Sequence, residues 1–314
     1  MADTNKVLDV VIIGAGVGGL TAAIMLQKKL NYYDYTIYEM ASDLGGTWYQ
    51  NEYPGCACDL PAHWYCLSVD PNPDWSCLFA GREEIQKYWK HLAQKHNLEQ
   101  RIKFNTEFIS AVWNEEQQNY TLKLRDSKTK GFREVKAKLV ISAIGVFKHP
   151  NWPDLPGRES FRGKMLHAQR WDHNVGLSGK RVGLIGNGCA GSQILPVISE
   201  DSSTTVVNFC RTPGWYIPRP QMRVSPVIQW AFRHVPFALR TLRYLVAGGC
   251  ELLYNQLKDN FISNLSRRLI EKAMLHRMRS LAPSKYHKYL TPNYRTFPNT
   301  TVIQMNTSLT NDCH

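Results

Sequence analysis

The run from Gly45 to Asp59 gathers residue types that suit a loop lying against a flat, charged ligand. It reads Gly-Gly-Thr-Trp-Tyr-Gln, continues after two residues with Tyr-Pro-Gly, and ends at the carboxylate of Asp59. Glycine and a turn-forming proline let a backbone approach such a ligand closely, while Trp48 and Tyr49 supply aromatic faces. An ordinary surface loop is the alternative interpretation. The elements that precede the run favour a ligand-contacting loop.

A short strand, a glycine turn and a helix come before this run. Residues 7–13 are rich in β-branched side chains, as in buried parallel strands, and a helical pattern begins at Leu20. Between them, Gly14, Gly16 and Gly19 form G-x-G-x-x-G. In a dinucleotide-binding unit the first glycine makes a tight turn, the second admits a pyrophosphate and the third lets helix and strand pack closely. The helix N-terminus then faces the phosphates.

The second strand of this unit ends at an acidic residue. Residues 35–38 form the strand pattern, and Glu39 follows 20 residues after Gly19, where a ribose-binding acid is expected. For Glu39 alone, a solvated charge at a strand end is the alternative. Strand, glycines, helix and acid together predict a dinucleotide site.

The same pattern recurs in the second half of the chain. A strand over 180–185 leads into a second G-x-G-x-x-G at Gly186, Gly188 and Gly191, and Ser192 continues into a helix. The next strand, 206–210, ends before Arg211, again 20 residues after the last glycine. The chain therefore contains two dinucleotide-type units.

The two units differ at the position expected to bind the ribose. Glu39 can accept hydrogen bonds from free ribose hydroxyls, whereas Arg211 can pair with a 2′-phosphate, and Thr212 can add a hydroxyl. A solvated cation at a strand end is the alternative for Arg211. The contrast predicts FAD in the first site and NADPH in the second.

The segments between and after these units complete the predicted organisation. We expect a helix over 82–95, antiparallel strands around 108–113 and 120–124, and a strand over 138–145 that returns to the first sheet. The Pro-rich segment 149–157 breaks regular structure, so we place a domain boundary there. This gives an FAD-binding domain over 1–150 and an NADPH-binding domain over 151–314.

Residues 224–290 are predicted to be largely helical. Within this segment, one helix face is expected to be apolar and to oppose a basic face that includes Arg267 and Arg268. The expected apolar face comprises Ile262, Leu265, Leu269, Ile270, Met274 and Met278. A basic helix resting on a membrane surface is the alternative interpretation.

Composition limits the function classes. The chain has 314 residues, 43% hydrophobic and 20% charged, as in a soluble globular protein with two domains of ordinary size. Its net charge of +12 suits anionic cofactors, and no run of five Lys or Arg residues indicates nucleic-acid binding. The eight cysteines show no metal-ligand spacing, and no secretory signal is evident. We expect free thiols and a cytoplasmic protein.

Four segments, in this order along the chain, resemble the motifs of type I Baeyer–Villiger monooxygenases of fungal secondary metabolism. They are Gly14–Gly19, Gly46 to Asp59, Phe161 to Asp172, and Gly186–Gly191. The third reads F-x-G-x-x-x-H-x-x-x-W-D and is the most specific, since related flavin monooxygenases that hydroxylate nitrogen or sulfur usually lack its Trp-Asp ending. Its histidine, His167, is expected at a hinge or behind the site rather than as a base. The match covers residues 7–220 well and the rest loosely.

The resemblance implies an α/β fold with two Rossmann-like domains, the second carrying the helical insertion and the first incomplete. It implies an enzyme that uses FAD, NADPH and O2 to insert one oxygen next to a ketone carbonyl, through a flavin peroxide, in polyketide or terpenoid biosynthesis. In the family, the carboxylate that matches Asp59 lies by the flavin and the nicotinamide and helps position a catalytic arginine. Asp59 is therefore the expected catalytic residue.

The residues expected to contact cofactors follow from the same motifs. On the flavin side they are Gly14, Gly16, Gly19, Glu39, Thr47, Trp48, Tyr49, Gln50, Ala57, Cys58, Asp59, Leu60 and Tyr65. On the NADPH side they are Gly186, Asn187, Gly188, Cys189, Ala190, Gly191, Ser192, Gln193, Arg211 and Thr212. No metal site is expected.

The chain departs from the family pattern near its end. Family members continue from a segment like 290–294 into the catalytic arginine, whereas here Arg295 stands in a different context and a polar tail follows. We therefore expect a shortened chain and assign Arg295 no such role. A heteroatom-hydroxylating flavin monooxygenase and an inactive nucleotide-binding relic remain as alternatives. The expected partners are a ketone and O2, membrane contact is not favoured, and oligomeric state is not indicated.

Overall fold

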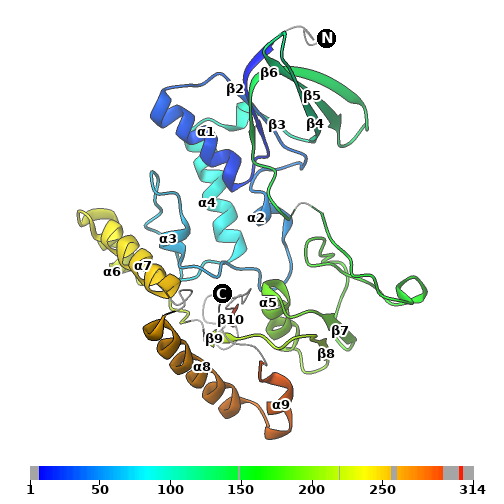
Figure 1. Cartoon of the computed structure of the whole chain (residues 1–314), viewed down its shortest axis with the longest axis vertical. Helices are drawn as coiled ribbons and strands as arrows, with labels where there is room; N and C mark the ends of the chain where they lie inside the picture. The colour runs from blue at the N-terminus through cyan, green and yellow to red at the C-terminus, as the bar shows by residue number, and fades with distance from the viewer. Residues whose placement is uncertain (1–6, 148, 219, 256–259, 293–303, 307–314) are drawn as a thin grey trace. The chain divides into compact units, whose positions relative to one another are not determined.

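The computed structural model describes residues 7–147, 149–218, 220–255, 260–292 and 304–306. The chain forms two compact units (Figure 1). The first consists of residues 1–52 and 82–171, and the second of residues 53–81 and 172–314. The chain therefore leaves the first unit after Glu52 and re-enters it at Arg82. The boundary near residue 150 stays a prediction about functional domains, and the departure at Arg295 lies outside the described residues.

The first unit is built on a six-stranded sheet with the order β3-β2-β1-β6-β5-β4. β1 pairs in parallel with β2 and β6, so Val11 lies between Thr36 and Val140, while β4, β5 and β6 pair antiparallel. The β-branched first strand, the antiparallel pair and the returning strand are thus confirmed. The strands are β1 (Val7–Ile13), β2 (Tyr35–Tyr38), β3 (Ile102–Lys103), β4 (Thr106–Asn114), β5 (Asn119–Asp126) and β6 (Phe132–Ser142).

Two long helices accompany this sheet. α1 packs beside β1 and α4 (Figure 1) and ends where Asn31 adopts a left-handed conformation. α4 buries the side chains of Ile85, Tyr88, Trp89 and Leu92, which is the face that the sequence predicts. The helices of this unit are α1 (Val17–Leu30), α2 (Thr47–Gln50), α4 (Arg82–Lys95), η1 (Glu99–Arg101) and η2 (Arg158–Ser160).

The second unit contains the second strand–helix–strand pattern. β7 pairs in parallel with β8, and α5 lies between them in sequence. β9 pairs in parallel with β10. The strands are β7 (Arg181–Ile185), β8 (Thr205–Phe209), β9 (Tyr216–Pro218) and β10 (Gln304–Asn306), and the first helices are α3 (Ala62–Tyr65) and α5 (Cys189–Ile198).

The predicted helical insertion is present in this unit. It comprises α6 (Pro226–His234), α7 (Ala238–Asn255), α8 (Phe261–Leu281), η3 (Ser284–Tyr286) and α9 (His287–Leu290). None of the helices in the described part of the chain combines the length and the apolar character needed to cross a membrane.

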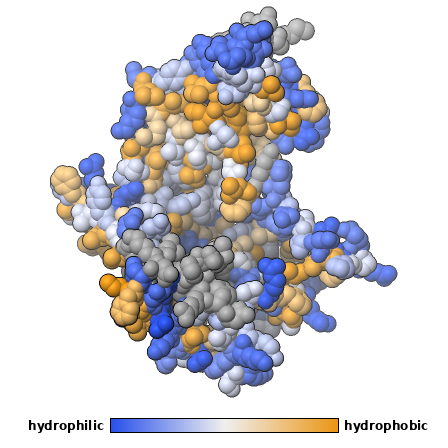
Figure 2. Space-filling view, viewed as in Figure 1, coloured by the Kyte–Doolittle hydropathy of each residue, from blue (hydrophilic) through white to orange (hydrophobic). Residues whose placement is uncertain are grey.

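The apolar face expected for α8 does not coincide with the side of the helix that is buried. Ser263, Arg267 and Met274 are buried, whereas Phe261 is 81% exposed and Ile262, Leu265 and Leu269 are exposed as well. Arg267 is accommodated because it donates a hydrogen bond to the side chain of Asn264. Helical periodicity separates two faces of a helix, but the neighbours of the helix decide which one is buried. Apolar side chains reach the surface in both units, as the orange areas of Figure 2 show.

The cysteines follow the expectation in part. Cys56, Cys58, Cys66, Cys189, Cys210 and Cys250 are free thiols. Cys77 is disulfide-bonded, so the expectation of a free thiol is wrong there.

Substituting Gly19 will test the packing of α1 against the first glycine turn. A Cβ at Gly19 would lie 1.9 Å from the carbonyl oxygen of Gly14. We expect Gly19→Ala to lower the free energy of unfolding by about 1–3 kcal/mol, because neither backbone segment has room to move. In the control Gly18→Ala the new Cβ would lie 3.6 Å from the Ala143 side chain, an ordinary contact. Equal unfolding curves in urea for the two variants would contradict this account.

The buried His63 predicts an acid-dependent stability. Its ring contacts Phe232 at 4.9 Å, and burial lowers the pKa of His63 to about 4. Between pH 6.5 and 4 the unfolded chain binds a proton at this site and the folded chain does not, so stability falls with acidification by on the order of 3 kcal/mol. Urea titrations across this pH range should show a smaller fall in the free energy of unfolding for His63→Leu than for the wild type. His173→Leu is the control, because His173 is exposed. An equal fall in the free energy of unfolding for His63→Leu and His173→Leu would refute the assignment.

Candidate dinucleotide sites

The first glycine turn joins the ends of three neighbouring strands. Gly14 follows β1 with φ +101°, and its N–H donates to the carbonyl of Tyr38 at the end of β2, at 2.8 Å. A Cβ at Gly14 would lie 2.5 Å from the carbonyl oxygen of Ala143, just after β6. Only glycine meets both conditions. Gly16 then precedes α1 without any side-chain cap, so the first amides of this 14-residue helix are placed to receive an anion.

Glu39 is a structural part of this turn rather than a solvated charge. Glu39 is only 5% exposed. One carboxylate oxygen accepts a hydrogen bond from the amide of Ala15 at 2.7 Å, and the other accepts one from the amide of Ala41 at 2.8 Å. Each oxygen retains a further lone pair, so Glu39 can still accept hydrogen bonds from ribose hydroxyls.

The first part of the Gly45–Asp59 run lies directly on this turn. The amide of Gly45 donates to the carbonyl of Ala15 at 2.9 Å. A Cβ at Gly46 would lie 2.8 Å from the Cα of Gly16. Two segments that the sequence predicts to contact the same cofactor are therefore in backbone contact.

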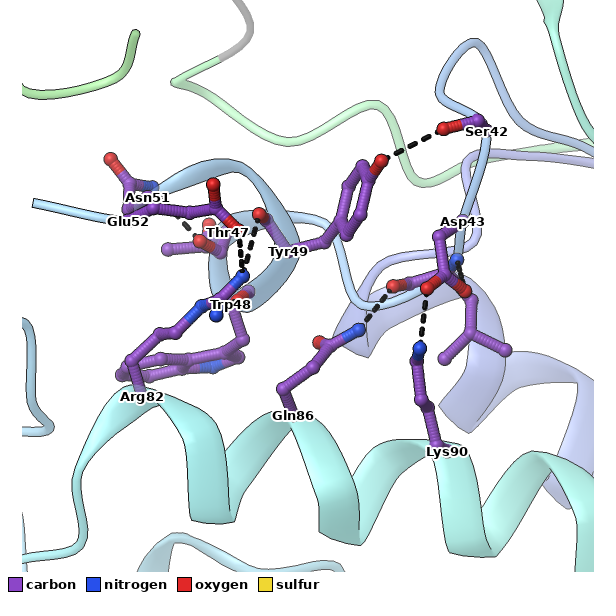
Figure 3. Close-up of polar contacts among 11 residues, drawn as sticks. Ser42, Asp43, Thr47, Trp48, Tyr49, Asn51, Glu52, Arg82, Gln86 and Lys90 are labelled. Carbon is purple, nitrogen blue, oxygen red and sulfur yellow. Dashed lines mark hydrogen bonds and ion pairs between the residues drawn. The ribbon is translucent and has the colours of Figure 1, made fainter. Parts of the chain in front are cut away.

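The residues that follow form the one-turn helix α2, which α4 holds in place (Figure 3). The guanidinium of Arg82 donates to the carbonyl oxygens of Trp48 at 2.7 Å and Tyr49 at 3.1 Å, and it pairs with Glu52. Gln86 donates to the carbonyl of Leu44 at 2.7 Å. Neither Arg82 nor Gln86 belongs to any of the motifs found in the sequence.

Lys90 completes this row of contacts. It pairs with the Asp43 carboxylate at 2.5 Å (Figure 3). Arg82, Gln86 and Lys90 are spaced at i, i+4 and i+8, so one face of α4 meets the loop. That spacing of polar residues beside the apolar face was the available sequence signal.

The predicted aromatic faces of the loop differ in exposure. Trp48 is 6% exposed and Tyr49 is partly buried, and the Tyr49 hydroxyl shares a hydrogen bond of 2.8 Å with Ser42. Thr47 and Gln50 lie at the two ends of α2.

The second part of the run belongs to the second unit, where Gln193 organises it. Gln193 is 2% exposed. Its side-chain oxygen accepts from the Tyr53 hydroxyl at 2.9 Å, and its amide nitrogen donates to Asp59 at 3.0 Å and to the carbonyl of Ala57 at 3.1 Å. Gln193, predicted as a cofactor contact, is therefore bound to the protein and positions Asp59.

The remaining residues predicted on this side lie along the same segment. Cys58 is buried, and its amide donates to the carbonyl of Ala80 at 3.1 Å. The amide of Leu60 contacts the Cys58 sulfur at 3.4 Å. Tyr65 is the last residue of α3 and is partly buried.

The second glycine turn repeats the geometry of the first. Gly186 has φ +105°, and its amide donates to the carbonyl of Phe209 at the end of β8, at 2.9 Å. A Cβ at Gly191 would lie 2.7 Å from the carbonyl oxygen of Gly186. Gly188 precedes the 10-residue α5, again without a side-chain cap. Both turns thus present an uncapped helix N-terminus.

The other predicted NADPH-side residues surround this turn. The side chain of Asn187 donates to the carbonyl of Thr212 at 2.9 Å, and the Ser192 hydroxyl donates to the carbonyl of Asn187 at 3.3 Å. Arg211 and Thr212 are exposed. Cys189 is exposed and Ala190 is partly buried at the start of α5. The position of Arg211 one residue after Cys210, beyond β8, leaves its charge accessible to a ligand.

His167 lies in the first unit, away from these groups in sequence. Its ring contacts Trp152 edge-on at 5.2 Å, and its Nδ1 accepts from the amide of Gln169 at 3.2 Å. Its supporting role stays a prediction. No group of three or more potential metal ligands occurs within the described residues.

Two protein-family models match the chain. The NAD(P)-binding Rossmann-like domain matches residues 12–81. The L-lysine 6-monooxygenase/L-ornithine 5-monooxygenase family matches residues 75–221. Together these matches span both glycine turns.

Curated relatives are similar to the chain over most of its length. A Baeyer–Villiger monooxygenase of Streptomyces coelicolor is 38% identical over 244 residues, which are 77% of this chain and 45% of that protein. The FAD-binding monooxygenase ktnD of Aspergillus niger is 35% identical over 91% of this chain and 48% of its own length. The chain therefore spans about half the length of the curated relatives it matches.

Solved structures have the same architecture. OTEMO in complex with FAD and NADP superposes with a TM-score of 0.80 at 25% identity, over 96% of this chain and 62% of that one. Oxidised steroid monooxygenase bound to NADP gives a TM-score of 0.77 at 26% identity, over 96% and 63%. The predicted pair of dinucleotide-binding folds is thereby confirmed. The chain belongs to the family of FAD-binding monooxygenases that includes the Baeyer–Villiger monooxygenases.

Proposed function

We propose that the first unit binds FAD, that the second binds NADPH, and that the protein inserts one oxygen atom of O2 next to a ketone carbonyl. The observation that carries this proposal is the pair of matching glycine turns, one completed by the buried Glu39 and the other by the exposed Arg211. Cofactor binding is the part of this activity that the two glycine turns account for.

The first turn fits FAD. The amides that begin α1 would bind the pyrophosphate, the Glu39 carboxylate would accept hydrogen bonds from the ribose, and the Gly45–Gln50 segment would line the flavin. The close approach of Gly46 to Gly16 leaves no room for a larger side chain at Gly46, so the two backbone segments lie directly against each other there. Bound FAD would supply redox chemistry and oxygen activation.

The second turn fits NADPH. The amides at the start of α5 would bind its pyrophosphate, and the Arg211 guanidinium with the Thr212 hydroxyl would bind the 2′-phosphate. Bound NADPH would supply the hydride.

Asp59 is the proposed catalytic residue. The Gln193 amide donates to one of its oxygens and leaves the other free to orient a cationic group or a ligand N–H. A cytoplasmic location goes with this proposal, since six of the seven described cysteines are free thiols and only Cys77 is disulfide-bonded.

A second candidate activity is the hydroxylation of an amine nitrogen. The match of residues 75–221 to the lysine and ornithine monooxygenase family favours it. The names of the curated relatives, among them a Baeyer–Villiger monooxygenase at 38% identity, favour the ketone reaction.

Product analysis will separate these activities. The protein loaded with FAD is incubated with NADPH, O2 and either cyclohexanone or L-ornithine. We expect the lactone to form and the hydroxylated amine not to form. The hydroxylated amine as the main product would support the second candidate. Oxygen consumption with neither product would indicate a nucleotide-binding relic and contradict the monooxygenase proposal.

Substituting Arg211 will test the NADPH assignment. We expect Arg211→Ala to raise the Kd for NADPH by roughly tenfold or more, with little change for NADH, because only NADPH carries the 2′-phosphate. Both constants can be measured by titration calorimetry. Arg181→Ala is the control, since Arg181 is exposed at the opposite end of β7. An equal change for NADPH and NADH would remove the phosphate role of Arg211.

A further inference from the structure

Glu52 and Arg82 mark the two points where the chain crosses between the units. Residues 53–81, which include Asp59, belong to the second unit, and both flanking residues belong to the first. The Arg82 guanidinium and the Glu52 carboxylate form an ion pair with an N–O distance of 2.5 Å. This pair joins the ends of the 53–81 excursion inside the first unit.

The same guanidinium holds the loop proposed to line the flavin. Its Nε donates to the Trp48 carbonyl and its Nη2 to the Tyr49 carbonyl, while Nη2 also reaches Glu52 (Figure 3). The Arg82 side chain is only 19% exposed. A guanidinium presents several donors in one rigid plane, which a single ammonium group does not. Arg82 therefore meets three acceptors that no other single side chain type would meet.

The neighbouring Lys90–Asp43 pair provides a comparison. It involves the same face of α4 and the same N–O distance of 2.5 Å, but the Lys90 side chain is 44% exposed and touches no loop carbonyl. Exposed ion pairs contribute little to stability. The two basic residues thus differ in what they hold, although both pair with an acid of the loop.

We propose that Arg82 is a positioning residue for the flavin-contacting loop. Through the Trp48 and Tyr49 carbonyls and through Glu52, it fixes the Thr47–Glu52 segment at the point where the chain departs toward Asp59. Arg82 acts through this backbone. The inference rests on the proposed FAD site in the first unit.

FAD titrations of four variants test this role. Arg82→Gln should raise the Kd for FAD by roughly tenfold or more, because two carbonyl hydrogen bonds and the ion pair are lost together. Arg82→Lys should recover part of this loss, and Glu52→Gln should show a smaller effect because only the ion pair is removed. Lys90→Gln is the matched control and should stay within about twofold of the wild type. The Kd for NADPH should be unchanged in all four.

The outcomes are distinct from a failure of the proposed function. A Kd for FAD that is within twofold of wild type in Arg82→Gln, or raised equally in Lys90→Gln, would overturn the positioning role. If Arg82→Gln does not fold, the Kd for FAD is compared in Arg82→Lys, Glu52→Gln and Lys90→Gln. Values within twofold of wild type in both Arg82→Lys and Glu52→Gln, or an equal rise in Lys90→Gln, would then overturn the positioning role. If wild type binds no FAD, the FAD assignment fails. In that case the rate of amide hydrogen exchange over residues 44–52 tests the role of Arg82 in the cofactor-free protein. Equal exchange rates in the Arg82 and Lys90 variants would contradict the inference.

Discussion

One steric constraint underlies both dinucleotide folds. The first turn of each helix must pass within contact distance of the backbone that precedes it. A Cβ would lie 1.9 Å from a carbonyl oxygen at Gly19 and 2.7 Å from one at Gly191. This close passage aims the helix N-terminus at the point where neighbouring parallel strands end. Everything else at the two sites is arranged around that backbone geometry.

Some residues around each turn hydrogen-bond to the protein itself, whereas others are exposed and can contact a ligand. Glu39 closes the first turn with both carboxylate oxygens, and Asn187 links the second turn to the backbone of Thr212. Gln193 is used in the same way, since it joins Tyr53, Ala57 and Asp59. In contrast, Arg211 is exposed. The exposed side chain is therefore the one best placed to discriminate between ligands.

Sequence reasoning found what short-range patterns encode. The glycines, Glu39 and the paired folds follow from spacing along single strand–helix–strand units, and the structure has them where they were expected. It did not find the contacts of Arg82 or Gln193, because these link segments far apart in sequence. For α8, periodicity distinguished two faces without identifying the neighbours that bury one side, and the buried Arg267 has no signature in its own segment.

The two hydrogen bonds between the Glu39 carboxylate and the backbone bear on the affinity of the site for a dinucleotide. The amides of Ala15 and Ala41 are both bound by this one carboxylate, through hydrogen bonds made within the protein. The backbone on both sides of the proposed ribose site is thus held by the protein's own contacts. Association with a preorganised site loses little conformational entropy, so affinity there should respond to contacts made and not to loop ordering.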